Sequence, residues 1–178
     1  MEKKQGDIQI LNMIRLKLVV IVTLFSLNYG NSQQIKGLNK IYFDIDGKNG
    51  VIFLNKGDFG LKNFNPERTY ISVKEVICID SLAKSYVTEK SKGKLPQQGF
   101  DNCPIIYKNW EQYSRQIMSY KEEISGDTIV WIQYIHKQEL IDHKHWKDNW
   151  VLTSGGCSNY WQISYNKNAK KFFDFVIN

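Results

Sequence analysis

Apolar residues alternate with other residues over two segments at the end of the chain, 160–165 and 170–177. A period of two residues is typical of a β-strand with one buried face. Asn166, Lys167 and Asn168 separate the two segments and favour a turn. The pattern therefore predicts two antiparallel strands that are joined by this turn.

Similar patterns occur upstream, in residues 113–120, 128–136 and 149–154. The first two segments flank a Ser-Gly-Asp turn at 125–127, which predicts a hairpin. The third segment predicts a further strand, so that the C-terminal half forms an antiparallel meander. A helix that begins near residue 110 is the alternative for the first segment, because its large apolar residues also fit helical spacing.

Residues 40–55 predict a separate hairpin, because β-branched and aromatic residues lie on both sides of a Gly-Lys-Asn-Gly stretch at 47–50. Over residues 72–89 the apolar positions recur near helical spacing, and Ser72 with Glu75 matches a capping box. The beginning of this segment also fits a strand, but the capping box favours a helix.

Together, these elements predict an α+β fold in which one helix packs on an antiparallel sheet, preceded by the hairpin at 40–55. Cystatin-like and nuclear-transport-factor-like folds combine a helix and a sheet in this manner. The comparison with these folds is an analogy of architecture, which does not by itself indicate a function.

An uncharged apolar run occupies residues 18–27, directly after Arg15 and Lys17. The run is about half as long as the roughly 20 residues that a membrane-spanning helix needs. A basic start, a short apolar run and small residues before position 33 are the features of a cleaved export signal. We therefore predict a signal peptide over residues 1–32, with an uncleaved membrane anchor as the alternative.

Cleavage there would leave residues 33–178 as a single domain without a membrane span, located in the periplasm, on the cell surface or outside the cell. Translation could begin at Met1 or at Met13, because residues 13–17 alone supply a basic start. Lys and Arg outnumber Asp and Glu by 24 to 18, for a net charge of +6. These charges are too scattered to indicate a nucleic-acid surface.

Export would place three cysteines, Cys78, Cys103 and Cys157, where a disulfide can persist. One bridge and one free thiol are expected, and the sequence leaves all three pairings open. Cys157 follows two glycines, but the strand-like segment after it supplies no helix N-terminus that would activate a thiolate. We therefore predict a bend with a buried or bridged cysteine at this point, and we predict no catalytic residue.

All three histidines, His136, His143 and His145, lie in one polar segment that also contains acidic residues. These residue types ligate zinc, so a metal-binding protein or a metal-dependent hydrolase that uses the three histidines is one alternative. Their spacing matches no zinc motif, which favours a polar loop without a cofactor. A second cation motif, DIDGKNG at 44–50, lacks the glycine and glutamate positions of an EF-hand and is interpreted as a hairpin turn.

Trp146 and Trp150 flank the charged part of the same segment. Tryptophan is frequent among the residues that dominate the energetics of protein interfaces. We therefore expect that one of these two side chains is exposed and anchors a partner, which would be an unknown protein or a small ligand.

The chain ends in a sequence of motifs that includes YSRQIMSY, SGGC, YWQISY and FDFVIN. Over residues 113–178 it resembles an uncharacterised family of small Bacteroidetes proteins. Those proteins end in a strand, a Gly-Gly bend, an aromatic strand and a Phe-Asp-Phe-x-x-Asn terminus. Ser154 stands where they usually have Asp before the two glycines. The resemblance implies an α+β fold and assigns no activity.

These observations favour an exported, non-enzymatic binding or interaction module. The main alternative is the metal-dependent protein described above. An inhibitor or immunity protein is a further alternative, which the small single domain permits.

Overall fold

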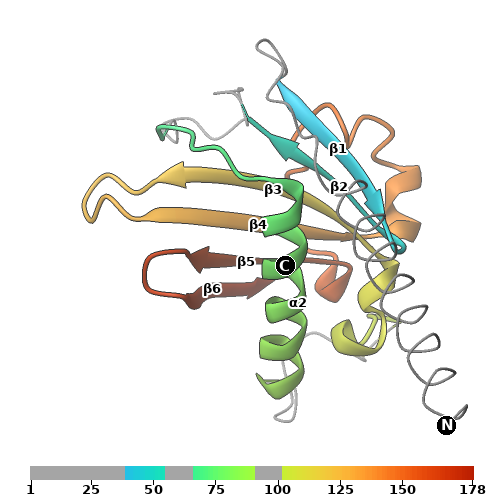
Figure 1. Cartoon of the computed structure of the whole chain (residues 1–178). Coiled ribbons are helices and arrows are strands. Elements are labelled where there is room, and N and C mark those ends of the chain that lie inside the picture. The colour runs from blue at the N-terminus through green and yellow to red at the C-terminus, as the bar shows by residue number, and fades with distance from the viewer. Residues whose placement is uncertain (1–38, 55–65, 91–101) are drawn as a thin grey trace, which may run out of the picture. The chain divides into compact units, whose positions relative to one another are not determined.

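A computed structural model describes residues 39–54, 66–90 and 102–178 of the chain (Figure 1). These residues form an open six-stranded sheet and one long helix, α2. The strands lie in the sheet in chain order, and all neighbours are antiparallel except β2 and β3, which run parallel. The bounds are β1 (Lys40–Ile45), β2 (Lys48–Phe53), α2 (Val73–Lys90), η1 (Ile106–Lys108), η2 (Trp110–Gln112), β3 (Tyr113–Lys121), β4 (Thr128–His136), η3 (Lys137–Ile141), η4 (Cys157–Asn159), β5 (Tyr160–Asn166) and β6 (Lys171–Ile177).

The described residues have the α+β architecture that the sequence predicts, with one α-helix and a mostly antiparallel sheet. The hairpins of β3 with β4 and of β5 with β6 lie where the alternating patterns predict them. The helical alternative near residue 110 is wrong beyond the short turn η2, since β3 begins at Tyr113.

The helix α2 begins where the capping box predicts it. The backbone N–H of Ser72 donates to Glu75 Oε2 at 3.0 Å, and the backbone N–H of Glu75 donates to Ser72 Oγ at 3.2 Å. These bonds satisfy two donors that have no partner inside the helix. Lys167, just after β5, adds an ion pair to Glu75 at 2.7 Å and so ties the start of the helix to the sheet.

β1 and β2 are joined by Asp46 and Gly47, whose φ angles of 52° and 76° are both left-handed. Two such residues are typical of a tight hairpin turn. The pair does not precede the sheet as a separate unit but forms one edge of it, because β2 also pairs with β3. Parallel neighbours need a long crossover connection, and the segment between β2 and β3 that makes this crossover contains α2.

The helix covers one face of the sheet, here called the helix face. Val76, Ala83 and Val87 from α2 pack there with Ile117, Ile132 and other inward-pointing residues of the strands. The opposite face, here called the loop face, carries a second apolar cluster, which is covered by the connection between β4 and β5. The members of this second cluster are Val51, Phe53, Met118, Ile135, Trp146, Trp150, Val151 and Tyr160.

The strand predicted over residues 149–154 is wrong, because this part of the connection has no strand structure. Two buried glutamines on the loop face bind its backbone instead. Gln116 accepts a bond from the Val151 N–H at 2.8 Å and donates to the carbonyl of Asn149 at 2.8 Å, and Gln133 donates to the carbonyl of Val151 at 2.8 Å. The side-chain amides thus supply the partners that a neighbouring strand would supply.

A disulfide joins Cys103 to Cys157, which resolves the pairing that the sequence leaves open. It links the segment before η1 to η4, and Cys78 on α2 is exposed with a free thiol. Among the described residues, no helix is long and apolar enough to span a membrane. The predicted signal peptide, residues 1–32, lies outside the described ranges.

A buried ion pair lies between the helix and the sheet. Asp80 of α2 and Arg115 of β3 are each 1% exposed, and Arg115 Nε lies 2.9 Å from Asp80 Oδ1. Tyr134 donates its hydroxyl to Asp80 Oδ1 at 3.0 Å, and Trp110 donates its indole N–H to Asp80 Oδ2 at 3.2 Å. Lys48 of β2 adds a second cation, with Nζ at 3.5 Å from Asp80 Oδ2.

Asp80 therefore receives donors from η2, β3 and β4 and lies near a cation on β2. Burial, with a smaller contribution from the nearby Asp80 carboxylate, raises the pKa of Tyr134 well above its usual value, so the phenol stays protonated and donates. A buried carboxylate needs such compensation, because transfer of an unpaired charge from water into the interior is costly.

Removal of the charge at this position should strongly destabilise the fold. We expect Asp80→Asn to lower the free energy of unfolding by about 3–5 kcal/mol, because Arg115 is left buried without its counterion. Lys84→Ala, also on α2, breaks the exposed pair of Lys84 with Glu111 of η2 and should cost less than about 1 kcal/mol. Urea denaturation of both variants checks this, and equal effects would contradict the importance of the buried pair.

The ion pair at the start of α2 should make stability depend on pH in the acid range. Burial alone would raise the pKa of Glu75, but the bonds from Lys167 and Ser72 outweigh it and lower this pKa to about 2. The contribution is therefore complete above the ordinary pKa of 4.5 and is lost as pH falls towards 2.

We expect Glu75→Gln to be less stable than the wild type at pH 7, with a difference that shrinks between about pH 4.5 and pH 2. Denaturation curves over this pH range measure the difference. Glu89→Gln, at the exposed far end of α2, is the matched control for loss of a helix acid. A difference for Glu75→Gln that is constant with pH would contradict the ion pair.

Candidate functional site

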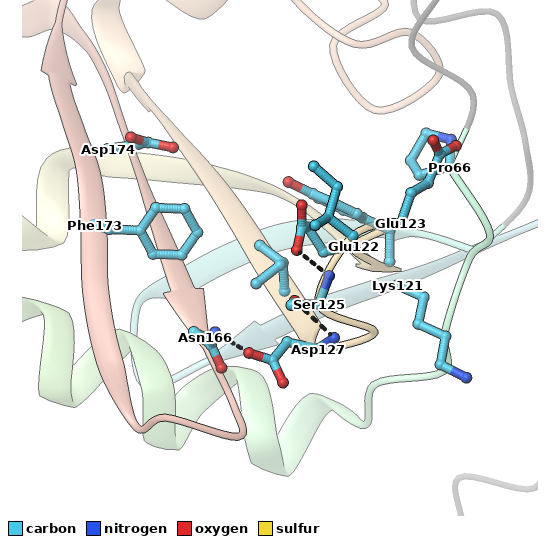
Figure 2. A pocket seen from close by; sticks show the side chains of 12 residues that line it. Pro66, Lys121, Glu122, Glu123, Ser125, Asp127, Asn166, Phe173 and Asp174 are labelled. Carbon is cyan, nitrogen blue, oxygen red and sulfur yellow. Dashed lines mark hydrogen bonds between the residues drawn. The ribbon is translucent and has the colours of Figure 1, made fainter.

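The end of the loop face that the β4–β5 connection leaves uncovered contains a groove of about 690 Å³, here called the hairpin groove. It lies at the tip of the β3–β4 hairpin and reaches across to β6. Figure 2 shows Phe173 projecting from β6 towards the hairpin, with Asp174 beside it and Glu122 opposite. The lining residues used below are Tyr120, Lys121, Glu122, Glu123, Ser125, Asp127, Ile129, Asn166, Phe173 and Asp174.

Part of the groove lining is apolar. Ile129 lines it with only 2% of its surface exposed, and Tyr120 is half-buried beside it. Phe173 is 38% exposed, so a large part of its ring is available for contact. The groove therefore offers apolar surface together with charged groups, which is a usual composition for a binding site.

Hydrogen bonds hold the hairpin loop in place. The Ser125 N–H donates to Glu122 Oε2 at 2.9 Å, and the Asp127 N–H donates to Ser125 Oγ at 3.1 Å. Gly126 has a φ of 72°, a conformation that glycine adopts without steric cost. Hydrogen bonds to Glu122 from the side chain and from the backbone N–H of Ser125 lower the pKa of Glu122, so this carboxyl is ionised at neutral pH.

The hairpin is also bonded to the turn between β5 and β6. Asn166 donates its side-chain N–H to Asp127 Oδ2 at 2.7 Å, and Asn168 Oδ1 accepts the Thr128 N–H at 2.9 Å. The two sides of the groove are therefore connected by direct hydrogen bonds, of which Figure 2 shows the one between Asn166 and Asp127.

A β-bulge places Asp174 in the groove lining. Phe173 pairs with Ser164, and Val176 pairs with Gln162. Two residues of β6, Asp174 and Phe175, therefore lie opposite one residue of β5, Ile163. The φ of Asp174 is 49°, in the left-handed region that aspartate adopts more readily than most residues. The irregular backbone at this position sets the point at which the Asp174 side chain leaves β6, beside the groove.

The electrostatics of the groove are dominated by acids. Burial raises the pKa of Tyr120, and the nearby carboxylates of Asp174 and Glu122 raise it further, whereas Arg68 lowers it. The Tyr120 hydroxyl is therefore neutral at physiological pH and lies in a field to which two carboxylates contribute. Among the described residues that line the groove, four are acids and one, Lys121, carries an ammonium group, on a chain whose net charge is +6.

The three predicted zinc ligands occupy different environments. The His136 ring packs edge-on against Tyr113 with centroids 5.3 Å apart, and burial lowers its pKa. His143 Nε2 shares a hydrogen bond of 2.9 Å with the hydroxyl of Tyr160, and His145 is exposed. Within residues 39–54, 66–90 and 102–178, no three His, Cys, Asp or Glu side chains form a group that could hold a metal ion.

Trp146 and Trp150 are each only 8% exposed, so the exposed indole that we expected is absent. Both rings pack under the β4–β5 connection, where Trp150 lies 5.1 Å from Trp131 and 5.7 Å from Phe53 between centroids. They line a smaller pocket of about 250 Å³ with His143 and His145. Four of the five residues predicted to bind a metal or a partner therefore do come together. Partner binding by the two tryptophans stays a prediction.

Sequence reasoning did not select the residues of the hairpin groove. The Ser-Gly-Asp turn marks the hairpin, but the approach of Asp174 to Glu122 depends on the strand order and on the bulge. An acidic residue in the middle of an aromatic edge strand was the one available signal. Comparisons with protein-family models, with curated proteins and with solved structures find no match for this chain.

The separate positions of the three histidines predict that they contribute little to zinc affinity. We expect the change of His136, His143 and His145 to alanine to leave zinc affinity unchanged, because these side chains form no common ligand group. Isothermal titration calorimetry measures this, with Cys78→Ser in both proteins because the exposed thiol is a ligand of its own. Stoichiometric zinc that is lost in the triple variant would restore the metal alternative.

Proposed function

We propose that this protein is an exported, non-enzymatic binding module and that the hairpin groove is its ligand surface. The observation that carries the proposal is the groove itself, in which carboxylates surround apolar side chains at the uncovered end of the loop face. A concave surface of this size with a few placed polar groups is the usual form of a binding site.

Two features of the lining favour binding over catalysis. Among the described residues that line the groove there is no histidine or cysteine, and the Ser125 hydroxyl oxygen already accepts the Asp127 N–H. A pair of acids that acts by acid–base catalysis needs one carboxyl with a raised pKa. The pKa of Glu122 is lowered instead, which suits a permanently charged recognition group.

Export is supported by the disulfide between Cys103 and Cys157, since such bridges persist in oxidising compartments. The signal peptide over residues 1–32 stays a prediction, as do the family resemblance and the analogy with cystatin-like and nuclear-transport-factor-like folds. An inhibitor or immunity protein is a special case of the proposal, in which the ligand of the groove is another protein.

Selection of peptides from a random displayed library on the full chain tests the proposal. We expect enriched peptides whose affinity falls about tenfold with Phe173→Ala, because aromatic side chains dominate such contacts. Val176→Ala is the matched control, since Val176 lies on the same strand, is 42% exposed and does not line the groove. Enrichment of no peptide, or equal loss with both variants, would overturn the proposal.

A further inference from the structure

Building on the proposed function, we infer that the hairpin groove binds a basic side chain of a polypeptide partner. The aliphatic stem of a lysine or arginine would lie along Phe173 and Ile129, and its cationic group would lie between Asp174 and Glu122. The partner class is thus a peptide segment with an exposed cationic residue.

Charge complementarity is the first support. Of the charged side chains in the described part of the groove lining, the one cation is Lys121, which points away from Phe173 and Asp174 (Figure 2). No residue in the described ranges forms an ion pair with Asp174 or Glu123. Arg68 lies near Tyr120 and offsets part of the acidic field, but among the described residues four lining carboxylates outnumber these two cations.

The apolar part of the groove is the second support, because it distinguishes a basic side chain from a bare cation. Lysine and arginine bury their methylene stems on apolar surface while their charged ends remain hydrated. Phe173 presents an exposed ring, which attracts a cation through its π-system, and the adjacent Asp174 supplies the opposite charge. A metal ion would gain nothing from these apolar contacts.

The fixed backbone is the third support. Asp174 is held by the bulge on β6, and Glu122 is held by the bonds from Ser125. The two carboxylates therefore need little rearrangement when a ligand enters, which lowers the entropic cost of binding.

Three blocked pentapeptides with the sequence Ala-Ala-X-Ala-Ala test the inference, where X is lysine, norleucine or glutamate. Norleucine keeps the stem of lysine and lacks its charge. Titration of the ¹⁵N-labelled full chain, followed by NMR, should show amide shifts in residues 120–129 and 164–175 with the lysine peptide. We expect the norleucine peptide to bind about fivefold more weakly and the lysine affinity to fall severalfold between 50 and 500 mM salt.

Asp174→Asn should weaken lysine-peptide binding about threefold or more and leave the norleucine peptide unaffected. Asparagine also accepts a left-handed φ, so the bulge is kept. Asp44→Asn is the matched control, because Asp44 is an exposed acid on β1 at the opposite edge of the sheet.

Equal binding of the lysine and norleucine peptides, or preference for the glutamate peptide, would overturn the inference. If the same amide signals shifted when the protein concentration was raised without peptide, the occupant of the groove would be a second copy of the chain. That result would also overturn the inference. Library peptides that bind the groove but contain no basic residue would overturn this inference alone, because the proposed function would remain supported.

Discussion

The arrangement of this fold depends on the buried carboxylate of Asp80. Apolar contacts alone would let a helix slide or rotate on a sheet at small cost, because the hydrophobic effect is not directional. Asp80 removes this freedom, since its oxygens meet donors from Trp110, Arg115 and Tyr134 and lie near Lys48. Any shift of α2 that separated these groups would leave a charge buried without its partners. The helix is therefore fixed against three strands at once.

This constraint decides where a ligand surface can exist. With α2 fixed on it, the helix face is filled by packed side chains. On the loop face, Gln116 and Gln133 hold the β4–β5 connection over one end of the sheet. Neither α2 nor the β4–β5 connection covers the hairpin end of the loop face, and the groove occurs there. The candidate site thus follows from the two elements that cover the rest of the sheet.

Local features of the structure were predictable from the sequence, and contacts between distant segments were not. The capping box spans four residues, and its bonds form as predicted. Asp80 and Arg115 lie among inward-pointing apolar positions of the helix and of β3, which was a readable sign of burial, but their pairing requires the sheet to form. The segment at 149–154 misled because Trp150 and Val151 are buried, as in a strand, while side-chain amides bind its backbone.

The bulge at Asp174 affects both the edge of the sheet and the lining of the groove. β6 is an edge strand, and an exposed edge can pair with a strand of another chain. A bulge with a left-handed, charged residue interrupts the regular row of backbone groups and so disfavours such pairing. The same distortion places the carboxylate in the groove lining. A partner therefore binds more readily over the loop face, through side-chain contacts, than along the edge as an added strand. The proposed recognition of a basic side chain uses such side-chain contacts over the loop face.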